Sequence, residues 1–287
     1  MTQYLGEVLT VRSGLLTLDK YRERLADKIG YLAARKGRAW RTLEDTANAG
    51  HTLRGGSAHW EDLRRGQDYY NEGLLMWMRI DASMRKQTGG RVTLDDFIIR
   101  FFAGSDWPGR GIKPFETSEI IETLNDVLPG DWEAIIDQHI NQTSDELPVA
   151  GLESVLGYRV VHTEERPDAI ESRESNGNYI NAEESIGLRI GNDGVVGRVI
   201  PGTPADEAGL AEEMEIVGVN DRRYSPDRLR EALGESKTSG GMELLVLDGD
   251  RFSRVSIGYS GGERYVKVER VEDEPDLLAE IMKPRVE

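Results

Sequence analysis

Residues 185–190, SIGLRI, and residues 194–224, GVVGRVIPGTPADEAGLAEEMEIVGVNDRRY, decide the fold expected for the second half of the chain. Short runs of β-branched residues stand between glycines, which is typical of short strands. Pro204 begins a short helical segment and Gly209 ends it, because proline fits the first turn of a helix and glycine fits the turn after it. A second helix is expected at 225–233, SPDRLREAL.

Outward from this stretch, the chain divides into two halves with different periodicity. Residues 1–145 have apolar residues at helical spacing, as in 18–37, where one stripe runs to Gly37. Residues 150–270 contain more strands, and the polar segment 164–182 is expected to be a hairpin or loop. The predicted fold class is therefore α+β. The predicted domains are an all-α lobe at 1–147, a β-rich domain at 148–270 with its core at about 183–260, and a C-terminal tail at 271–287 that forms at most one weak helix.

Composition excludes several classes of function. The formal net charge is −16, which disfavours binding to nucleic acid or to an anionic membrane surface. The chain has no cysteine, so disulfides and thiolate chemistry are excluded. No window approaches 18 uninterrupted apolar residues and the first residues lack a leader pattern, so a soluble protein with no membrane span is expected. The compartment, cytoplasmic or exported, is not determined by these features.

The order of elements in the second half resembles a PDZ domain of the bacterial, circularly permuted kind. The resemblance implies that an extended peptide C-terminus adds as a strand beside GLRI. The loop at Ser185–Leu188 would bind the terminal carboxylate through backbone amides. The implied peptide-binding residues are Ser185, Ile186, Gly187, Leu188, Ile190, Leu229 and Leu233. The sequence departs from the family at Glu213-Met214, where a Gly-Asp turn is usual. The alternative to peptide binding is a module that only packs on its neighbour and leaves the groove unused.

Four segments of the first half resemble the glycyl aminopeptidase-like zinc metallopeptidases. They are TQYLGEVLTVRSGLLTLDKY at 2–21, GRAWRTLEDTANAG at 37–50, DYYNEGLLMWMRID at 68–81 and GGRVTLDDFIIRFF at 89–102. They occur in the order found in that family and are followed by the PDZ-like segment. These enzymes are gluzincins, so the resemblance implies that 1–147 is the helical lobe of a thermolysin-like catalytic domain.

The family's zinc site is missing from this sequence. An HExxH helix supplies two histidines and a general-base glutamate in the family, and a later glutamate completes the site. The chain has no HExxH, and its four histidines, His51, His59, His139 and His162, form no such pair. The resemblance implies that the chain begins just after the third ligand. Zinc is thus expected in the full-length parent protein. In this chain we expect no metal ligand and no cofactor.

Residues 67–78, QDYYNEGLLMWM, supply the one catalytic candidate. In gluzincin aminopeptidases a tyrosine in a Tyr-x-Lys-Gly-like stretch donates its hydroxyl to the oxyanion of the tetrahedral intermediate. The resemblance places Tyr70 in that role, with Glu72 where lysine is common. From the residues alone, the alternative is that Tyr69 and Tyr70 are interface residues with satisfied hydroxyls.

Two functional hypotheses follow. In the first, the chain is the C-terminal part of a zinc aminopeptidase-like enzyme, inactive by itself, whose PDZ-like domain binds peptide or protein C-termini. In the second, it is a non-enzymatic adaptor with a peptide-binding domain. The missing N-terminal catalytic lobe is an expected partner in the first case, and an apolar face left by its absence would favour an artefactual dimer.

Overall fold

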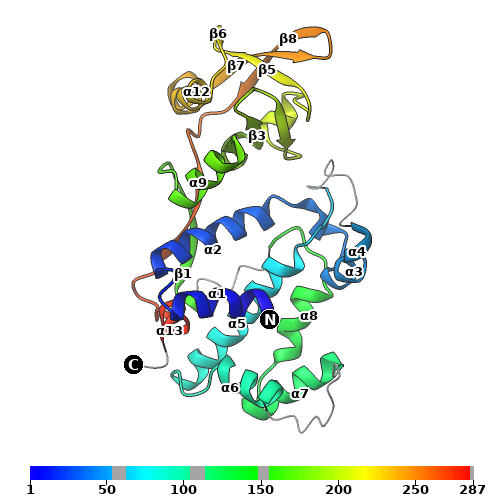
Figure 1. Cartoon of the computed structure of the whole chain (residues 1–287), viewed down its shortest axis with the longest axis vertical. Coiled ribbons are helices and arrows are strands. Elements are labelled where there is room, and N and C mark those ends of the chain that lie inside the picture. The colour runs from blue at the N-terminus through cyan, green and yellow to red at the C-terminus, as the bar shows by residue number, and fades with distance from the viewer. Residues whose placement is uncertain (54–62, 104–113, 148–154, 285–287) are drawn as a thin grey trace.

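The computed structural model describes residues 1–53, 63–103, 114–147 and 155–284. A unit made mainly of helices and a smaller β-rich unit follow one another along the long axis of the molecule (Figure 1). Helices are combined with antiparallel sheets, which confirms the α+β class predicted from the sequence. The described helices include none with the length and apolar character needed to cross a membrane.

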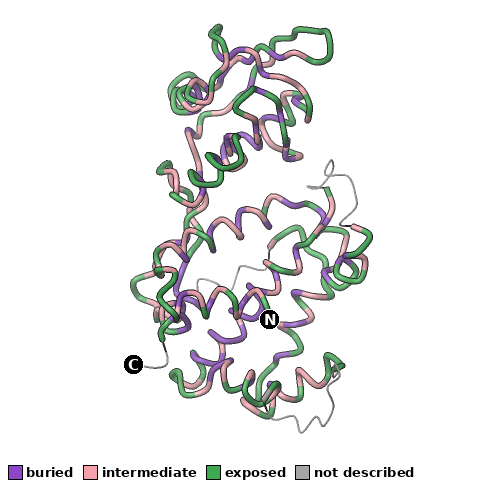
Figure 2. The backbone as a smooth tube through the Cα atoms, viewed as in Figure 1, coloured by how far each residue is buried: buried purple, intermediate pink, exposed green. Residues whose placement is uncertain are grey.

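The helical unit is built around α5 (Tyr69–Thr88), whose residues 74–78 are all buried. A helix that is apolar on most sides is stable only when other elements surround it. The other helical elements in the first half of the chain also belong to this unit. They are α1 (Thr2–Arg12), α2 (Leu18–Ala33), η1 (Lys36–Ala39), α3 (Leu43–Asn48), α4 (Gly50–Leu53), α6 (Leu94–Ile98), the π-helical turn η2 (Ile99–Ala103), α7 (Thr117–Val127) and α8 (Trp132–Ile140). Figure 2 marks buried residues along α5 and at intervals along α1 and α2.

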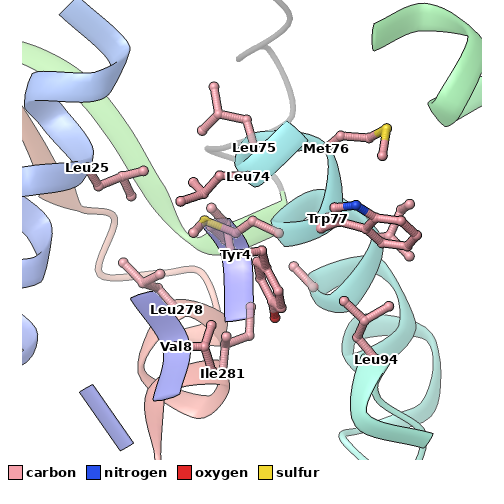
Figure 3. Packing of buried hydrophobic residues seen from close by; sticks show 14 of the residues in the cluster. Tyr4, Val8, Leu25, Leu74, Leu75, Met76, Trp77, Leu94, Leu278 and Ile281 are labelled. Carbon is pink, nitrogen blue, oxygen red and sulfur yellow. The ribbon is translucent and has the colours of Figure 1, made fainter. Parts of the chain in front are cut away.

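The end of the chain also contributes to the helical unit. The predicted C-terminal tail contains α13 (Leu277–Met282), and Leu278 and Ile281 are fully buried in the same core. Figure 3 shows them beside Tyr4 and Val8 of α1, close to Leu74. The tail is therefore part of the helical core, because its apolar residues are spaced to face α1 and α5.

A two-stranded antiparallel ribbon joins the two units. It consists of β1 (Tyr158–Thr163) and β9 (Tyr265–Arg270), paired from Tyr158 opposite Arg270 to Thr163 opposite Tyr265. Tyr158 and Val268 belong to the core of the helical unit. Residues 155–158 and 265–268 thus pack in part against helices, although the sequence places them in the second domain.

The β-rich unit has two antiparallel sheets. One has the order β2-β3-β4 and the other β6-β5-β7-β8. Its elements are α9 (Asp168–Gly177), β2 (Tyr179–Ala182), α10 (Glu183–Ile186), β3 (Leu188–Gly191), β4 (Val196–Val199), α11 (Pro204–Glu207), β5 (Glu215–Val219), β6 (Arg222–Arg223), α12 (Pro226–Ser239), β7 (Gly241–Asp248) and β8 (Arg251–Gly258). These strands and α12 enclose a second, separate apolar core.

The segment 164–182 corrects one prediction, since it forms α9 and β2 and not a hairpin or loop. The helix was missed because it has no apolar stripe. It is held on α2 mainly by charge, through the ion pairs Lys20–Asp168 and Asp27–Arg173 and a hydrogen bond from the Ala169 amide to a Glu23 carboxylate oxygen.

Candidate functional site

The first turn of α5 presents Tyr69 and Tyr70 side by side. Their ring centroids are 4.8 Å apart. Tyr70 is 42% exposed, whereas Tyr69 is half-buried and directs its hydroxyl toward Gly50. Within the described residues the Tyr70 hydroxyl has no hydrogen-bond partner, so it is free to donate to a ligand from solvent. This placement fits the role that the family resemblance gives to Tyr70.

Two exposed apolar side chains lie on the segments that precede α5. Trp40 is 61% exposed and Leu63 is 39% exposed, and the Trp40 indole N–H donates to the Leu63 carbonyl oxygen at 2.9 Å. Arg65 continues this loop and donates to the carbonyl oxygen of Arg41, which follows Trp40. The loop and the turn at Trp40 are thus fastened to each other beside the start of α5.

Directly beneath the tyrosines, Glu72 is fully buried between two guanidinium groups. Arg38 from η1 and Arg65 from the preceding loop each form an ion pair with one of its carboxylate oxygens. Burial raises the pKa of Glu72, and the positive charges of Arg65 and Arg38 oppose that rise. The structure buries Arg38 in this pair.

A second carboxylate extends the network. Asp68 lies 3.6 Å from Arg35 at the end of α2 and 3.3 Å from Arg65. Three arginines therefore connect η1, the end of α2 and the loop before α5 to one turn of helix. An ion-pair network of this kind fixes the backbone that carries Tyr70, because a buried charge without a partner costs several kcal/mol.

His139 of α8 completes the cluster. Its side chain is fully buried, its Nδ1 atom lies 3.9 Å from Glu72 Oε1, and neither ring nitrogen has a hydrogen bond within the described structure. Burial lowers the pKa of His139 to about 3, and the charges of Arg79, Arg38 and Arg65 act in the same direction. The ring is therefore neutral at neutral pH.

The described residues contain no group of three or more His, Asp or Glu side chains that could hold a metal ion. His51 is exposed on α4, His139 is buried on α8, and His162 of β1 pairs with Glu184 at 3.2 Å. His59 lies outside the described residues. The described residues therefore do not fit a catalytic zinc.

The residues implied in peptide binding are brought together in the β-rich unit, but they are covered. Leu188 and Ile190 of β3 and Leu229 and Leu233 of α12 are at most 1% exposed and belong to one apolar cluster. Ser185 and Ile186 lie in α10, and the Ser185 hydroxyl accepts a hydrogen bond from the Arg264 amide. Gly187 has a φ of +77°, and its amide donates to the carbonyl oxygens of Ala182 and Glu183.

The cover is β2, which the sequence analysis missed. It pairs antiparallel with β3, so both edges of β3 are hydrogen-bonded to strands of this chain. The available signal was the alternation in YINA at 179–182, whose second and fourth residues, Ile180 and Ala182, are buried. The peptide-binding role of these residues stays a prediction.

Comparison with known proteins supports part of this assignment. Residues 1–76 match the family model of the M61 glycyl aminopeptidases, which confirms the family resemblance predicted from the sequence. A crystal structure of an aminopeptidase N family protein from Idiomarina loihiensis matches with a TM-score of 0.70 and 14% identity, covering 99% of this chain and 47% of that one. The chain thus spans about half the length of that protein, and at this identity the match shows a shared fold.

Two further comparisons add little. The PDZ domain of HtrA3 bound to a phage-derived ligand, FGRWV, matches with 18% identity over 39% of this chain and 92% of that domain, at a TM-score of 0.20. A superposition this poor carries no argument about the fold, so the PDZ-like character of the β-rich unit stays a prediction. A search of curated proteins finds no match.

Proposed function

We propose that this chain is the C-terminal part of a zinc-dependent, aminopeptidase-like peptidase. The match of residues 1–76 to the M61 glycyl aminopeptidases carries the proposal. That segment includes Tyr70, the exposed tyrosine at the start of α5. In this proposal the helical unit forms one wall of the substrate cleft, and the β-rich unit binds a peptide chain.

Tyr70 is the proposed oxyanion donor. As water attacks the scissile carbonyl, negative charge develops on the carbonyl oxygen, and a phenol hydroxyl held nearby donates a hydrogen bond to it. One pre-positioned donor of this kind contributes about 2.7–4 kcal/mol to transition-state stabilisation. The buried pairs of Glu72 with Arg38 and Arg65 hold this helical turn in place, so the donor needs little reorganisation during the reaction.

The test uses the full-length protein with its upstream sequence. Tyr70→Phe is expected to lower kcat by about 100- to 1000-fold with little change in bound zinc. Tyr69→Phe is the matched control, because its half-buried hydroxyl faces Gly50 and is expected to leave kcat within a few-fold. An unchanged kcat in Tyr70→Phe would remove the proposed catalytic role.

The chain by itself is expected to bind no stoichiometric zinc and to cleave nothing, because its sequence lacks HExxH. Elemental analysis and an aminopeptidase assay on the isolated chain measure this, and tight zinc together with turnover would overturn the proposal. The coding sequence upstream of Met1 separates the enzyme from the adaptor. An in-frame HExxH and a glutamate just before this segment support the enzyme, whereas a true start codon at this position supports the adaptor.

The proposed ligand of the β-rich unit is a peptide C-terminus beside β3. Peptides with a free carboxylate are expected to shift the NMR signals of Leu188, Ile190 and Leu229, and amidated peptides to bind more weakly. Equal binding of both forms would argue against carboxylate recognition by the loop at Ser185–Leu188.

A further inference from the structure

The edge of β3 that faces away from β4 is occupied by this chain's own β2. Register runs from Tyr179 opposite Gly191 to Ala182 opposite Leu188, and β2 is the outermost strand of its sheet. Ile180 and Ala182 are at most 2% exposed and share the apolar cluster with residues of β3 and α12. An added strand that places alternate side chains into an apolar groove is the arrangement in which sheet edges bind peptides.

The end of β2 leads into the one-turn helix α10, which Gly187 caps. The Ala182 carbonyl oxygen accepts a hydrogen bond from the Gly187 amide at 3.2 Å, and the same amide contacts the Glu183 carbonyl oxygen at 3.0 Å. A free peptide that ended at the position of Ala182 would place a carboxylate oxygen at this amide. The strand therefore occupies the side-chain positions of a ligand, and its last carbonyl oxygen lies at the Gly187 amide, where a terminal carboxylate is expected to bind.

We infer that residues 179–182 are an internal ligand of this groove, which a peptide C-terminus of the same chemistry replaces. That chemistry is a small apolar last residue, a branched apolar residue two positions earlier and a free carboxylate. The inference rests on the peptide-binding part of the proposed function.

One buried carboxylate holds the outer edge of the internal ligand. Glu174 of α9 is 5% exposed, and its Oε1 accepts a hydrogen bond from the Asn181 amide at 2.7 Å. Its Oε2 pairs with Arg230 of α12 at 2.7 Å and with Arg166 at 3.0 Å. Glu174 thus ties the outer edge of β2 to the helix that forms the opposite wall of the groove.

The rest of α9 is anchored elsewhere, so β2 can leave without it. Asp168 and Arg173 pair with Lys20 and Asp27 of α2. Asn178, which joins α9 to β2, adopts a left-handed conformation with φ +52°, as single residues do where a helix ends and the chain turns. Opening the groove requires a change at this joint, at the Glu174 contacts and in the β2–β3 pairing.

The test measures binding of a fluorescent peptide with the sequence of residues 176–182 and a free C-terminal carboxylate. Glu174→Ala is expected to bind it about tenfold more tightly than the unaltered chain, because the occupied state is weakened. Glu164→Ala is the matched control, since Glu164 also pairs with a cation of α12, Lys237, but is exposed. Equal affinities in Glu174→Ala and the unaltered chain would overturn the inference.

A reversible lock gives a second measurement that does not depend on the stability of a variant. Asn181 and Arg189 are opposite each other on β2 and β3, at a spacing that a disulfide can bridge, and the chain has no other cysteine. The oxidised N181C/R189C variant is expected to bind the peptide at least about tenfold more weakly than the same protein after reduction. Equal binding by both forms would show that β2 does not block the site.

Hydrogen exchange of residues 179–182 separates the inference from the proposed function. Peptide binding that increases exchange in β2 supports the internal ligand. Tight peptide binding with unchanged β2 exchange overturns the internal ligand but keeps peptide binding. If β2 is released in Glu174→Ala and neither the free nor the amidated peptide binds, the peptide-binding function itself fails, and the inference fails with it.

Discussion

The buried His139 makes the stability of the helical unit depend on pH in a calculable way. Its pKa is lowered to about 3 in the folded protein, first by burial and then by the nearby arginine charges, from 6.5 for the unperturbed side chain. Between these values the unfolded chain binds a proton that the folded chain does not, so stability falls as pH falls through this range. From pH 7 to pH 5 the loss from this one group is about 2 kcal/mol.

The variant His139→Leu removes the titrating group and keeps an apolar side chain of similar size. The wild-type chain is expected to lose about 2 kcal/mol more stability than the variant between pH 7 and pH 5, since all other groups titrate alike in both. At pH 7 the variant is expected to be at least as stable, because both ring nitrogens lack hydrogen bonds in the described structure. His51→Leu, at an exposed position on α4, is the control and should keep the wild-type pH dependence.

Urea unfolding followed by tryptophan fluorescence measures the free energy of unfolding of the helical unit. All five tryptophans precede the β-rich unit in the sequence. Three of them, Trp40, Trp77 and Trp132, are described in the helical unit, so the signal follows the unfolding of that unit. If His139→Leu and the wild type lose equal stability between pH 7 and pH 5, the histidine is not held neutral in the folded protein.

Three further predictions concern single contacts. Tyr4→Phe removes a buried 2.6 Å hydrogen bond to Asp81 and should lower the free energy of unfolding by about 2 kcal/mol, measured by the same fluorescence assay. Glu213→Gly should stabilise the β-rich unit by about 0.5–1 kcal/mol, because Glu213 has φ +72°, whereas Glu213→Ala should give no gain; slower hydrogen exchange in β5 would report the difference. Gly187→Ala should destabilise that unit by more than about 1 kcal/mol, since φ is +77° and the new methyl group meets the Thr203 side chain; a higher melting temperature by circular dichroism would contradict this.

Local sequence patterns predicted those elements whose signals are local. The strands β3, β4, β7 and β8 stand between glycines and turns, and α12 starts with Ser-Pro, whose serine caps the helix. Glu213 is informative, because the departure from the usual glycine falls on a residue that adopts the left-handed conformation glycine favours. A non-glycine residue in this conformation carries a local cost in backbone strain.

Elements that depend on distant partners could not be predicted in this way. The helix α9 has a polar sequence because ion pairs with α2 and α12 hold it, and nothing within 168–177 names those partners. The apolar residues of β9 and α13 are of types that could pack in the core of the helical unit or in that of the β-rich unit. The pairing of β1 with β9 brings the last part of the chain back to α1 and α5.

At the candidate site, the sequence identifies Tyr70 but not what holds it. Glu72 stands where the family commonly has lysine. A carboxylate buried at this position would be an uncompensated negative charge unless cations pair with it. Arg38 and Arg65, 34 and 7 residues away, supply two guanidinium groups to it. Charged side chains are usually exposed, so no sequence rule would have buried all three.

The helix α2 lies between the Glu72 network and the β-rich unit. Its sequence explains how closely the β-rich unit approaches the helix. At its C-terminal end Arg35 lies beside Asp68, which precedes α5. One turn earlier Gly30 faces the β-rich unit, where a methyl group would come within 2.9 Å of Glu184 and 3.0 Å of Val266. Glycine lowers helix stability, so its presence in the last turns of α2 is explained by this close approach. The structure thus places Glu184, which follows β2 in the chain, against the last turns of α2, and Arg35 just beyond that helix joins the network around Glu72.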